Sequence, residues 1–153
     1  MPATPLDRNQ TVELPSGPMS VGALLERVSS PEPGILVLRE VDGQTVEGAA
    51  ITLGRISELA EEMDHFAVIV DLSEVPTRPA SDYREYMEKW AMAMPPFHTA
   101  YVLPPVGAIT RMALRWVALR VLKVHPESTS SNHDSVAEAV AHCRRHLAQR
   151  REA

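Results

Sequence analysis

Residues 66–72 read Phe-Ala-Val-Ile-Val-Asp-Leu, an apolar run of the length of a β-strand. Its apolar side chains follow one another without the polar alternation of a half-exposed strand. Such a run is typical of a strand that is covered on both faces, as in the middle of a parallel sheet. Pro76 and Pro79 end the run. We therefore expect this strand to lie inside a sheet that has helices packed against it.

Helical patterns flank this strand in the sequence. Apolar residues spaced by three and four predict a helix that follows the N-cap Thr45 and continues to Met63. A second helix is predicted from Asp82 to Pro95, with Asp82 and Glu85 at the spacing of a capping box. The same criteria predict strands over residues 99–103 and 127–131 and helices over residues 106–122 and 135–147, the last with Ser135 and Glu138 at capping-box spacing.

The N-terminal part of the chain is richer in turn-forming residues. Residues 1–20 contain four prolines and are expected to form a flexible arm. Two apolar stretches follow, over residues 23–28 and 35–41, and the sequence Ser-Ser-Pro-Glu-Pro-Gly between them is a strong turn signal. They predict a β-hairpin, although residues 23–27 also fit a short helix.

Together these elements predict a single α/β domain over residues 21–150, in which about four helices pack on a mixed sheet of four to five strands. A length of 153 residues fits one domain. The hydrophobic fraction of 44% and the charged fraction of 23% exclude a disordered, collagenous or coiled-coil chain. The single cysteine excludes a disulfide framework and a cysteine-based zinc site.

Charge and hydropathy argue against two kinds of partner, nucleic acid and the interior of a membrane. Residues 1–76 carry a net charge of −9 and residues 77–153 a net charge of +4. An isoelectric point of about 5.7 argues against a nucleic-acid partner, which requires a dense cationic surface. No apolar run reaches the roughly 18 residues of a membrane span, and the polar N-terminus lacks a secretory signal. We therefore expect a cytoplasmic protein.

Two motifs in this order of elements resemble a known family. Residues 35–45 read Ile-Leu-Val-Leu-Arg-Glu-Val-Asp-Gly-Gln-Thr and precede a predicted helix, and residues 68–75 read Val-Ile-Val-Asp-Leu-Ser-Glu-Val. This arrangement resembles the STAS domain, the fold of sporulation anti-sigma-factor antagonists, and more closely its SpoIIAA-like bacterial subgroup. The likeness covers about residues 22–148 in element order. It implies a STAS-like fold and a non-enzymatic regulatory or protein-interaction module.

The same resemblance suggests a docking surface. The family carries an Asp-Ser-Ser-Gly stretch whose second serine can be phosphorylated, and its equivalent here is Pro-Ala-Ser-Asp over residues 79–82, in which only Ser81 matches. The resemblance therefore implies a docking corner of Arg78, Ser81 and Asp82, with Ser81 as the candidate phospho-acceptor. The N–H groups of a helix start can hold a phosphate, whereas the charge of Asp82 opposes one. In the alternative interpretation, Ser81 is only a cap or turn residue.

The predicted helix over residues 106–122 is apolar almost all round, so more than one of its faces must be covered. A second copy of the chain in a homodimer is one candidate cover. A small hydrophobic, lipid-like ligand is another, in a pocket lined by Ile109, Met112 and Trp116 whose acidic head group would bind Arg111 or Arg115. A third is transient contact with a membrane surface.

Other candidate chemistry is weak. His142 and His146 have the spacing of metal ligands on one helix face, but the neighbouring Arg144 and Arg145 disfavour a cation, and a solvated helix face is expected. Cys143 falls on the buried stripe of this helix and is expected in the core.

No glycine-rich phosphate loop or nucleophile motif occurs, so no catalytic residue, metal or cofactor is expected. Asp71 ends the central strand, where α/β proteins often place function, yet a lone carboxylate is as often a turn or cap residue. We expect a dimeric interaction module with a protein partner, and as the alternative a carrier or sensor of a hydrophobic ligand beside residues 106–122.

Overall fold

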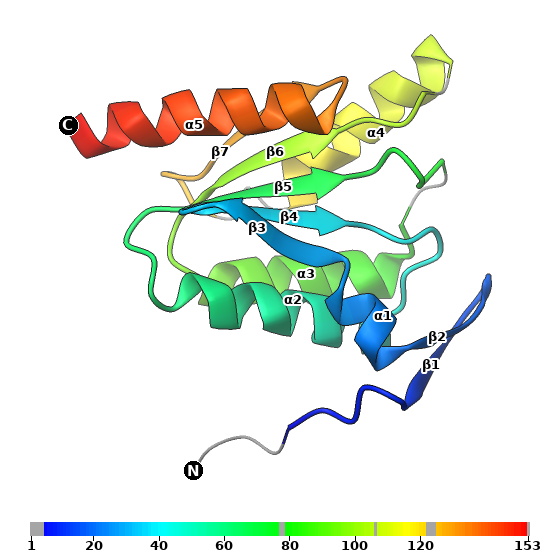
Figure 1. Ribbon diagram of the computed structural model, residues 1–153. Helices are drawn as coiled ribbons and strands as arrows, with labels where there is room; N and C mark the ends of the chain where they lie inside the picture. Colours follow the sequence, from blue (N-terminus) through cyan, green and yellow to red (C-terminus); the bar gives the residue numbers. More distant parts are fainter. Residues whose placement is uncertain (1–4, 77–78, 106, 122–124, 153) are drawn as a thin grey trace.

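The computed structural model describes residues 5–76, 79–105, 107–121 and 125–152. The elements follow in the order β1 (Thr11–Leu14), β2 (Gly17–Ser20), α1 (Val21–Leu25), β3 (Val28–Glu32), β4 (Ile35–Arg39), α2 (Val46–Ala60), β5 (Ala67–Asp71), α3 (Ser81–Ala93), β6 (His98–Val102), α4 (Ala108–Val121), β7 (Thr129–His133) and α5 (Val136–Glu152) (Figure 1). Among these helices, none has the length and apolar character that crossing a lipid bilayer requires.

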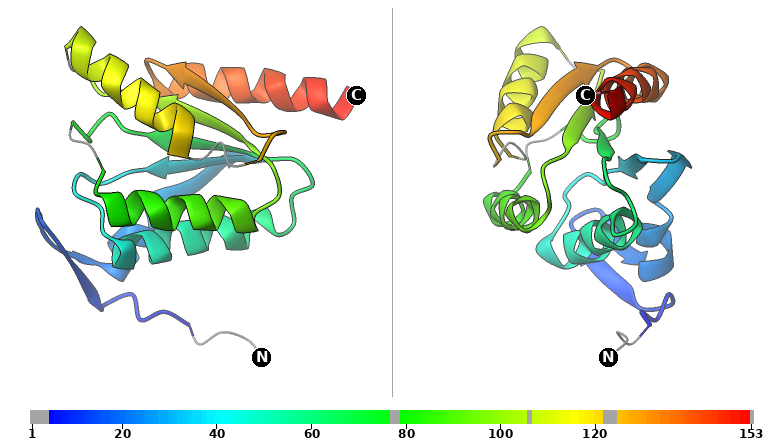
Figure 2. Two further views of the ribbon diagram at one scale, coloured as in Figure 1. Left: turned by 180° about the vertical axis from the view of Figure 1, so that it is seen from behind. Right: turned by 90° about the vertical axis from the view of Figure 1, so that its left-hand side faces the viewer.

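The main sheet has five strands in the order β3-β4-β5-β6-β7. Strands β3 and β4 are antiparallel, and every later pair is parallel. Helices α2 and α3 lie against one face of the sheet and α5 against the other (Figure 1 and Figure 2). The predicted α/β fold, with a mixed sheet of four to five strands and helices packed on it, is confirmed.

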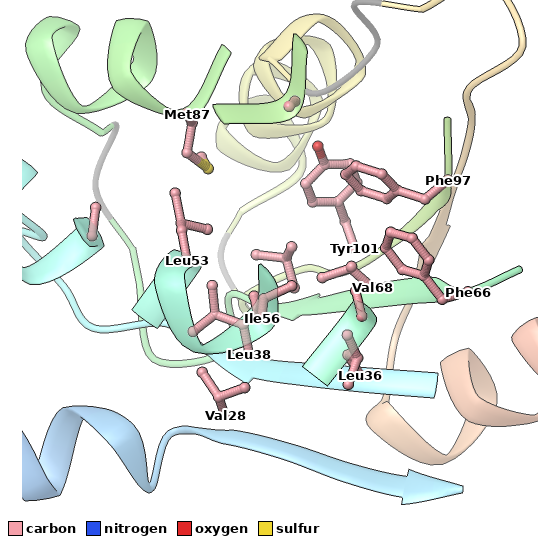
Figure 3. Close-up of a cluster of buried hydrophobic side chains, with 14 of the residues drawn as sticks. Val28, Leu36, Leu38, Leu53, Ile56, Phe66, Val68, Met87, Phe97 and Tyr101 are labelled. Carbon is pink, nitrogen blue, oxygen red and sulfur yellow. The ribbon is translucent and has the colours of Figure 1, made fainter. Parts of the chain in front are cut away.

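The central strand β5 is buried along its whole length, as its continuous apolar sequence predicts. Alternate residues of a strand point to opposite faces. Val68 therefore joins the core under α2 and α3, whereas Ile69 joins the core under α5. Figure 3 shows Leu53 and Ile56 of α2 in the first of these cores, close to Leu38 of β4.

Two of the predicted helix starts are confirmed. The Thr45 hydroxyl accepts the N–H of Gly48 at 3.1 Å and begins α2, which ends at Ala60, three residues before the predicted end. The Ser135 hydroxyl accepts the N–H of Glu138 at 3.1 Å at the start of α5. The predicted capping box at Asp82 and Glu85 is wrong, because α3 already begins at Ser81 and its N-cap is Ala80.

The N-terminal segment differs from the expected flexible arm. Residues 11–20 form the β1–β2 hairpin, in which Val12 and Leu14 are 2% and 5% exposed. These side chains pack with Val21, Leu24 and Val41 in a small core of their own. The physical reason is the alternation of Val12 and Leu14 with polar residues, which gives the hairpin one apolar face despite its prolines.

The predicted hairpin before α2 exists, with different bounds. Residues 21–25 form the short helix α1, the alternative that the sequence left open, and the first strand of the hairpin is β3 over 28–32. The prolines of the turn signal did not prevent this strand. Pro31 lies on an edge strand, at a shift of register between Ser29 and Glu32, where a missing N–H is tolerated.

Candidate functional site

The carboxyl ends of β4 and β5, where α/β proteins often place function, lie at the same end of the sheet, on the side where α3 begins (Figure 1). Glu40 follows β4 directly, Asp71 is the last residue of β5, and α3 begins at Ser81. This edge of the sheet therefore brings the predicted docking corner next to two acidic residues from neighbouring strands.

Glu40 is only 3% exposed, and hydrogen bonds surround its carboxyl group. Oε1 accepts the N–H of Val41 at 3.0 Å and the side-chain amide of Gln44 at 2.9 Å. Oε2 accepts the hydroxyl of Tyr83, which lies in the first turn of α3. Burial raises the pKa of Glu40, and the three donors partly offset that rise. The Glu40–Tyr83 pair thus fixes the start of α3 to the end of β4.

The same buried environment shifts the pKa of Tyr83. It is 3% exposed, and burial together with the negative charge of Glu40 raises the pKa of its hydroxyl well above the usual value of 10. The hydroxyl therefore keeps its proton at neutral pH and remains a donor to Glu40. Sequence reasoning missed this pair, because the two residues are 43 positions apart and lie on different elements.

Two further contacts stiffen this edge. The guanidinium of Arg27 donates to the main-chain oxygens of Arg39 at 3.3 Å and Glu40 at 3.2 Å, and it lies 3.5 Å from the carboxylate of Glu74. The carboxylate of Asp71 accepts the N–H of Ser73 at 3.0 Å. Asp71 therefore acts as a turn residue here, which is one of the two roles the sequence left open.

The docking corner itself is at the surface. Ser81 and Asp82 are exposed, and the Asp82 carboxylate accepts the N–H of Tyr83 at 2.8 Å. Ser81 is the first residue of α3 and not its cap, so the interpretation of Ser81 as a helix cap is wrong. Arg78 lies outside the described residues. The structure thus brings Ser81 and Asp82 together, directly beside the residue that Glu40 holds.

The second candidate surface lies on α4. Ile109 and Met112 are 85% and 70% exposed, and Arg115 is also exposed. Arg111 forms an ion pair with Asp134, just before α5, instead of facing a ligand pocket. The side chain of Trp116 lies outside the described part of the chain. A second copy of the chain against this face stays a prediction.

Two hollows are lined by residues away from α4. An open one of about 750 Å³ lies between the N-terminal segment and α2, where Leu6, Ile51 and Gly54 line it. A small one of about 10 Å³ lies near Phe97 and His146. Neither is lined by a described residue of α4. A ligand pocket along that helix therefore stays a prediction.

The expected solvated face at His142 and His146 is wrong. Both side chains are half-buried and contact the ring of His98 in β6, and His142 also contacts the ring of His133 in β7. His98 lies far from α5 in the sequence, and no local sequence pattern predicts the contact between these rings. Within the part of the chain that the structure describes, no group of three or more His, Cys, Asp or Glu side chains is arranged to hold a metal ion.

Cys143 lies in the core, as predicted. It is fully buried, and burial raises the pKa of its thiol to about 11. A thiol that stays protonated and inaccessible is not a nucleophile at neutral pH.

The chain was compared with known proteins. No family model matches it, and no curated protein or solved structure matches it at a significant level.

Proposed function

We propose that the protein is a non-enzymatic regulatory module that binds a partner protein through the docking corner at the start of α3. The observation that carries this proposal is the combination of exposed Ser81 and Asp82 with a buried anchor directly after them. Tyr83 is held by Glu40, so the two exposed side chains are presented from a fixed position. A preformed surface binds with a smaller loss of conformational entropy than a mobile one.

The chemistry below the corner also favours binding over catalysis. The described groups beside the corner that could transfer a proton include Glu40, Tyr83 and Asp71, which are 3%, 3% and 7% exposed. Their hydrogen bonds go to neighbouring groups of the same chain. A general acid or base must come within hydrogen-bond reach of a substrate, and this packing leaves these groups no such access.

The proposal also rests on the sequence resemblance that first pointed to this corner. The STAS-like motifs over residues 35–45 and 68–75 correspond to β4 with the start of α2 and to β5 with its following turn. The serine equivalent to the regulatory serine of that family is the exposed Ser81. Its place at a helix start keeps an added phosphate at the surface, near the main-chain N–H groups of the first turn and away from the core.

Quantitative affinity capture from cells of the native host tests this function. We compare the wild-type chain with Ser81→Asp and with the matched control Met92→Asp, which places the same charge at an exposed position near the other end of α3. We expect a protein that the wild type and Met92→Asp capture equally and that Ser81→Asp captures at least tenfold less. Equal capture by all three chains would contradict docking through this corner.

A further inference from the structure

Four histidines from three separate elements form a compact cluster beside α5. His98 begins β6, His133 ends β7, and His142 and His146 lie one turn apart on α5. We call these residues the histidine cluster. Its ring centroids are separated by 4.4 Å for His98 and His146, 4.8 Å for His133 and His142, 5.0 Å for His98 and His142, and 6.3 Å for His142 and His146.

Hydroxyl groups of β7 lie within hydrogen-bond distance of the rings of His98 and His133. The two ring nitrogens of His98 lie 2.7 Å from the hydroxyl of Thr129 and 2.9 Å from that of Ser131. The Ser131 hydroxyl also lies 2.8 Å from Nε2 of His133. Nε2 of His142 is buried and makes no hydrogen bond. Neutral rings fit these partners, because a hydroxyl can serve each ring nitrogen as donor or acceptor.

The charges around the cluster do little to favour protonated rings. Arg145 and Arg150 of α5 face it and oppose added positive charge, and His65 lies near His98 and His146 on the other side. The acidic groups that face it are Glu138 and Asp134, which act on His133, and Asp134 is already paired with Arg111. Among the described residues, no carboxylate contributes to the pKa shifts of His98, His142 or His146.

These surroundings lower the pKa of all four rings. Burial is the largest cause in each case, followed by the neighbouring histidines or by Arg145. The pKa of His98, which is 5% exposed, falls to about 3. The docked cluster therefore excludes protons that free histidines would take up below a pH of about 6.5.

The cluster lies at the seam between α5 and the sheet. Cys143 and Leu147, which directly follow His142 and His146, bury the apolar side of α5 against Ile35, Ile69 and Val102. Any motion that let His142 and His146 take up protons in water would lift these apolar side chains as well. The packing of α5 and the charge state of the cluster are thus coupled.

We propose that the histidine cluster is a pH-sensitive latch, which holds α5 on the sheet at neutral pH and favours its release in mild acid. A helix that lifts from the sheet lets the histidines become charged, whereas a docked helix keeps them neutral. Acidification from pH 7.5 to pH 5.5 therefore shifts the equilibrium toward the lifted helix. Release uncovers the apolar sheet face formed by Ile35, Ile69 and Val102.

Hydrogen exchange of the purified chain tests the latch. Protection of the α5 amides (136–152) is measured at pH 7.5 and pH 5.5 with a chelator present, is corrected for the intrinsic exchange rate, and is compared with protection of α2 (46–60). At pH 5.5 we expect a loss of protection in α5 of about tenfold for each histidine that gains its proton on opening, because this pH lies one unit below 6.5. Protection of α5 is expected to stay below that of α2 at both pH values, because α5 lifts without unfolding the rest of the chain.

Two variants complete the test. The double variant His142→Gln/His146→Gln is expected to lose the part of the pH dependence that these two rings contribute, about tenfold each, whatever its protection at pH 7.5, because the ratio between the two pH values is the readout. The control His65→Gln, an exposed histidine outside the four ring contacts, is expected to retain the wild-type ratio. Equal protection of α5 at both pH values, protection of α5 equal to that of α2 throughout, or a full pH response in the double variant would overturn the proposal.

Discussion

The buried contact between Glu40 and Tyr83 determines where α3 begins relative to the sheet. Tyr83 donates to a carboxylate that receives two more hydrogen bonds from Val41 and Gln44. Both side chains are almost fully buried, so water cannot replace a lost partner. Leaving a buried polar group without one of its partners costs more than losing an exposed hydrogen bond.

The variant Tyr83→Phe tests the strength of this contact. It removes one donor from buried Glu40 and keeps the aromatic packing, so we expect the free energy of unfolding to fall by about 1 to 3 kcal/mol. The matched control is Tyr86→Phe on the same helix, which takes no part in the hydrogen bonds of Glu40 and is expected to cost under about 0.5 kcal/mol. Urea denaturation measures both. Equal losses would mean that Glu40 does not depend on Tyr83.

His98 offers a second test at this scale, through the pH dependence of stability. Its pKa is about 3 in the folded chain and about 6.5 when unfolded, so the unfolded state binds more protons between these values. Stability is then highest above pH 6.5 and falls on acidification. From pH 6.5 to pH 5.5, His98 alone contributes a loss of about 1 kcal/mol.

Urea denaturation across this pH range checks the slope. The variant His98→Gln should flatten it, and the control His65→Gln should leave it unchanged. A slope that His98→Gln does not alter would show that this ring takes up its proton equally well in the folded chain.

Among the secondary-structure elements, the β1–β2 hairpin is the one whose role changes most between sequence and structure. Its apolar residues close a small core against α1 and the start of the β4–α2 connection. Leu14 is 5% exposed and packs there, although it lies in the segment expected to be a flexible arm.

Truncation of the Leu14 side chain measures how much the hairpin contributes to the stability of the fold. Leu14→Ala is expected to lower the free energy of unfolding by about 2 to 4 kcal/mol, the usual cost of removing a buried leucine side chain. Leu6→Ala serves as the control, because Leu6 is 52% exposed, and its expected cost is under about 0.5 kcal/mol. A Leu14→Ala variant as stable as the wild type would mean that the hairpin is only loosely attached.

Over the whole molecule, local sequence patterns predicted the main layers of the fold. The uninterrupted apolar run at β5 and the spaced apolar residues of α2 each record which faces are buried, and both predictions are confirmed. The Pro-rich start concealed a hairpin, because the turn residues outweighed the brief alternation at Val12 and Leu14. The prolines within 29–34 likewise placed the first strand too early.

The contacts that build the candidate site could not be predicted in this way. Glu40 meets Tyr83, and His98 meets His142 and His146, only because parallel strand pairing and the crossover helices bring distant segments together. No local pattern in a single sequence predicts contacts between such distant residues. The sequence did point to Ser81, because this residue matches a motif of the family that the chain resembles and because it precedes an apolar helical pattern.

The docking corner is the central proposal for this protein, and site-specific photocrosslinking in cells of the native host tests it most directly. A photoreactive residue is placed at position 81 or, as the control, at position 92, about 16 Å away along the same helix. We predict a discrete crosslinked partner protein from position 81 and none from position 92. Identical products from both positions, or no product from position 81, would contradict a docking surface at the start of α3.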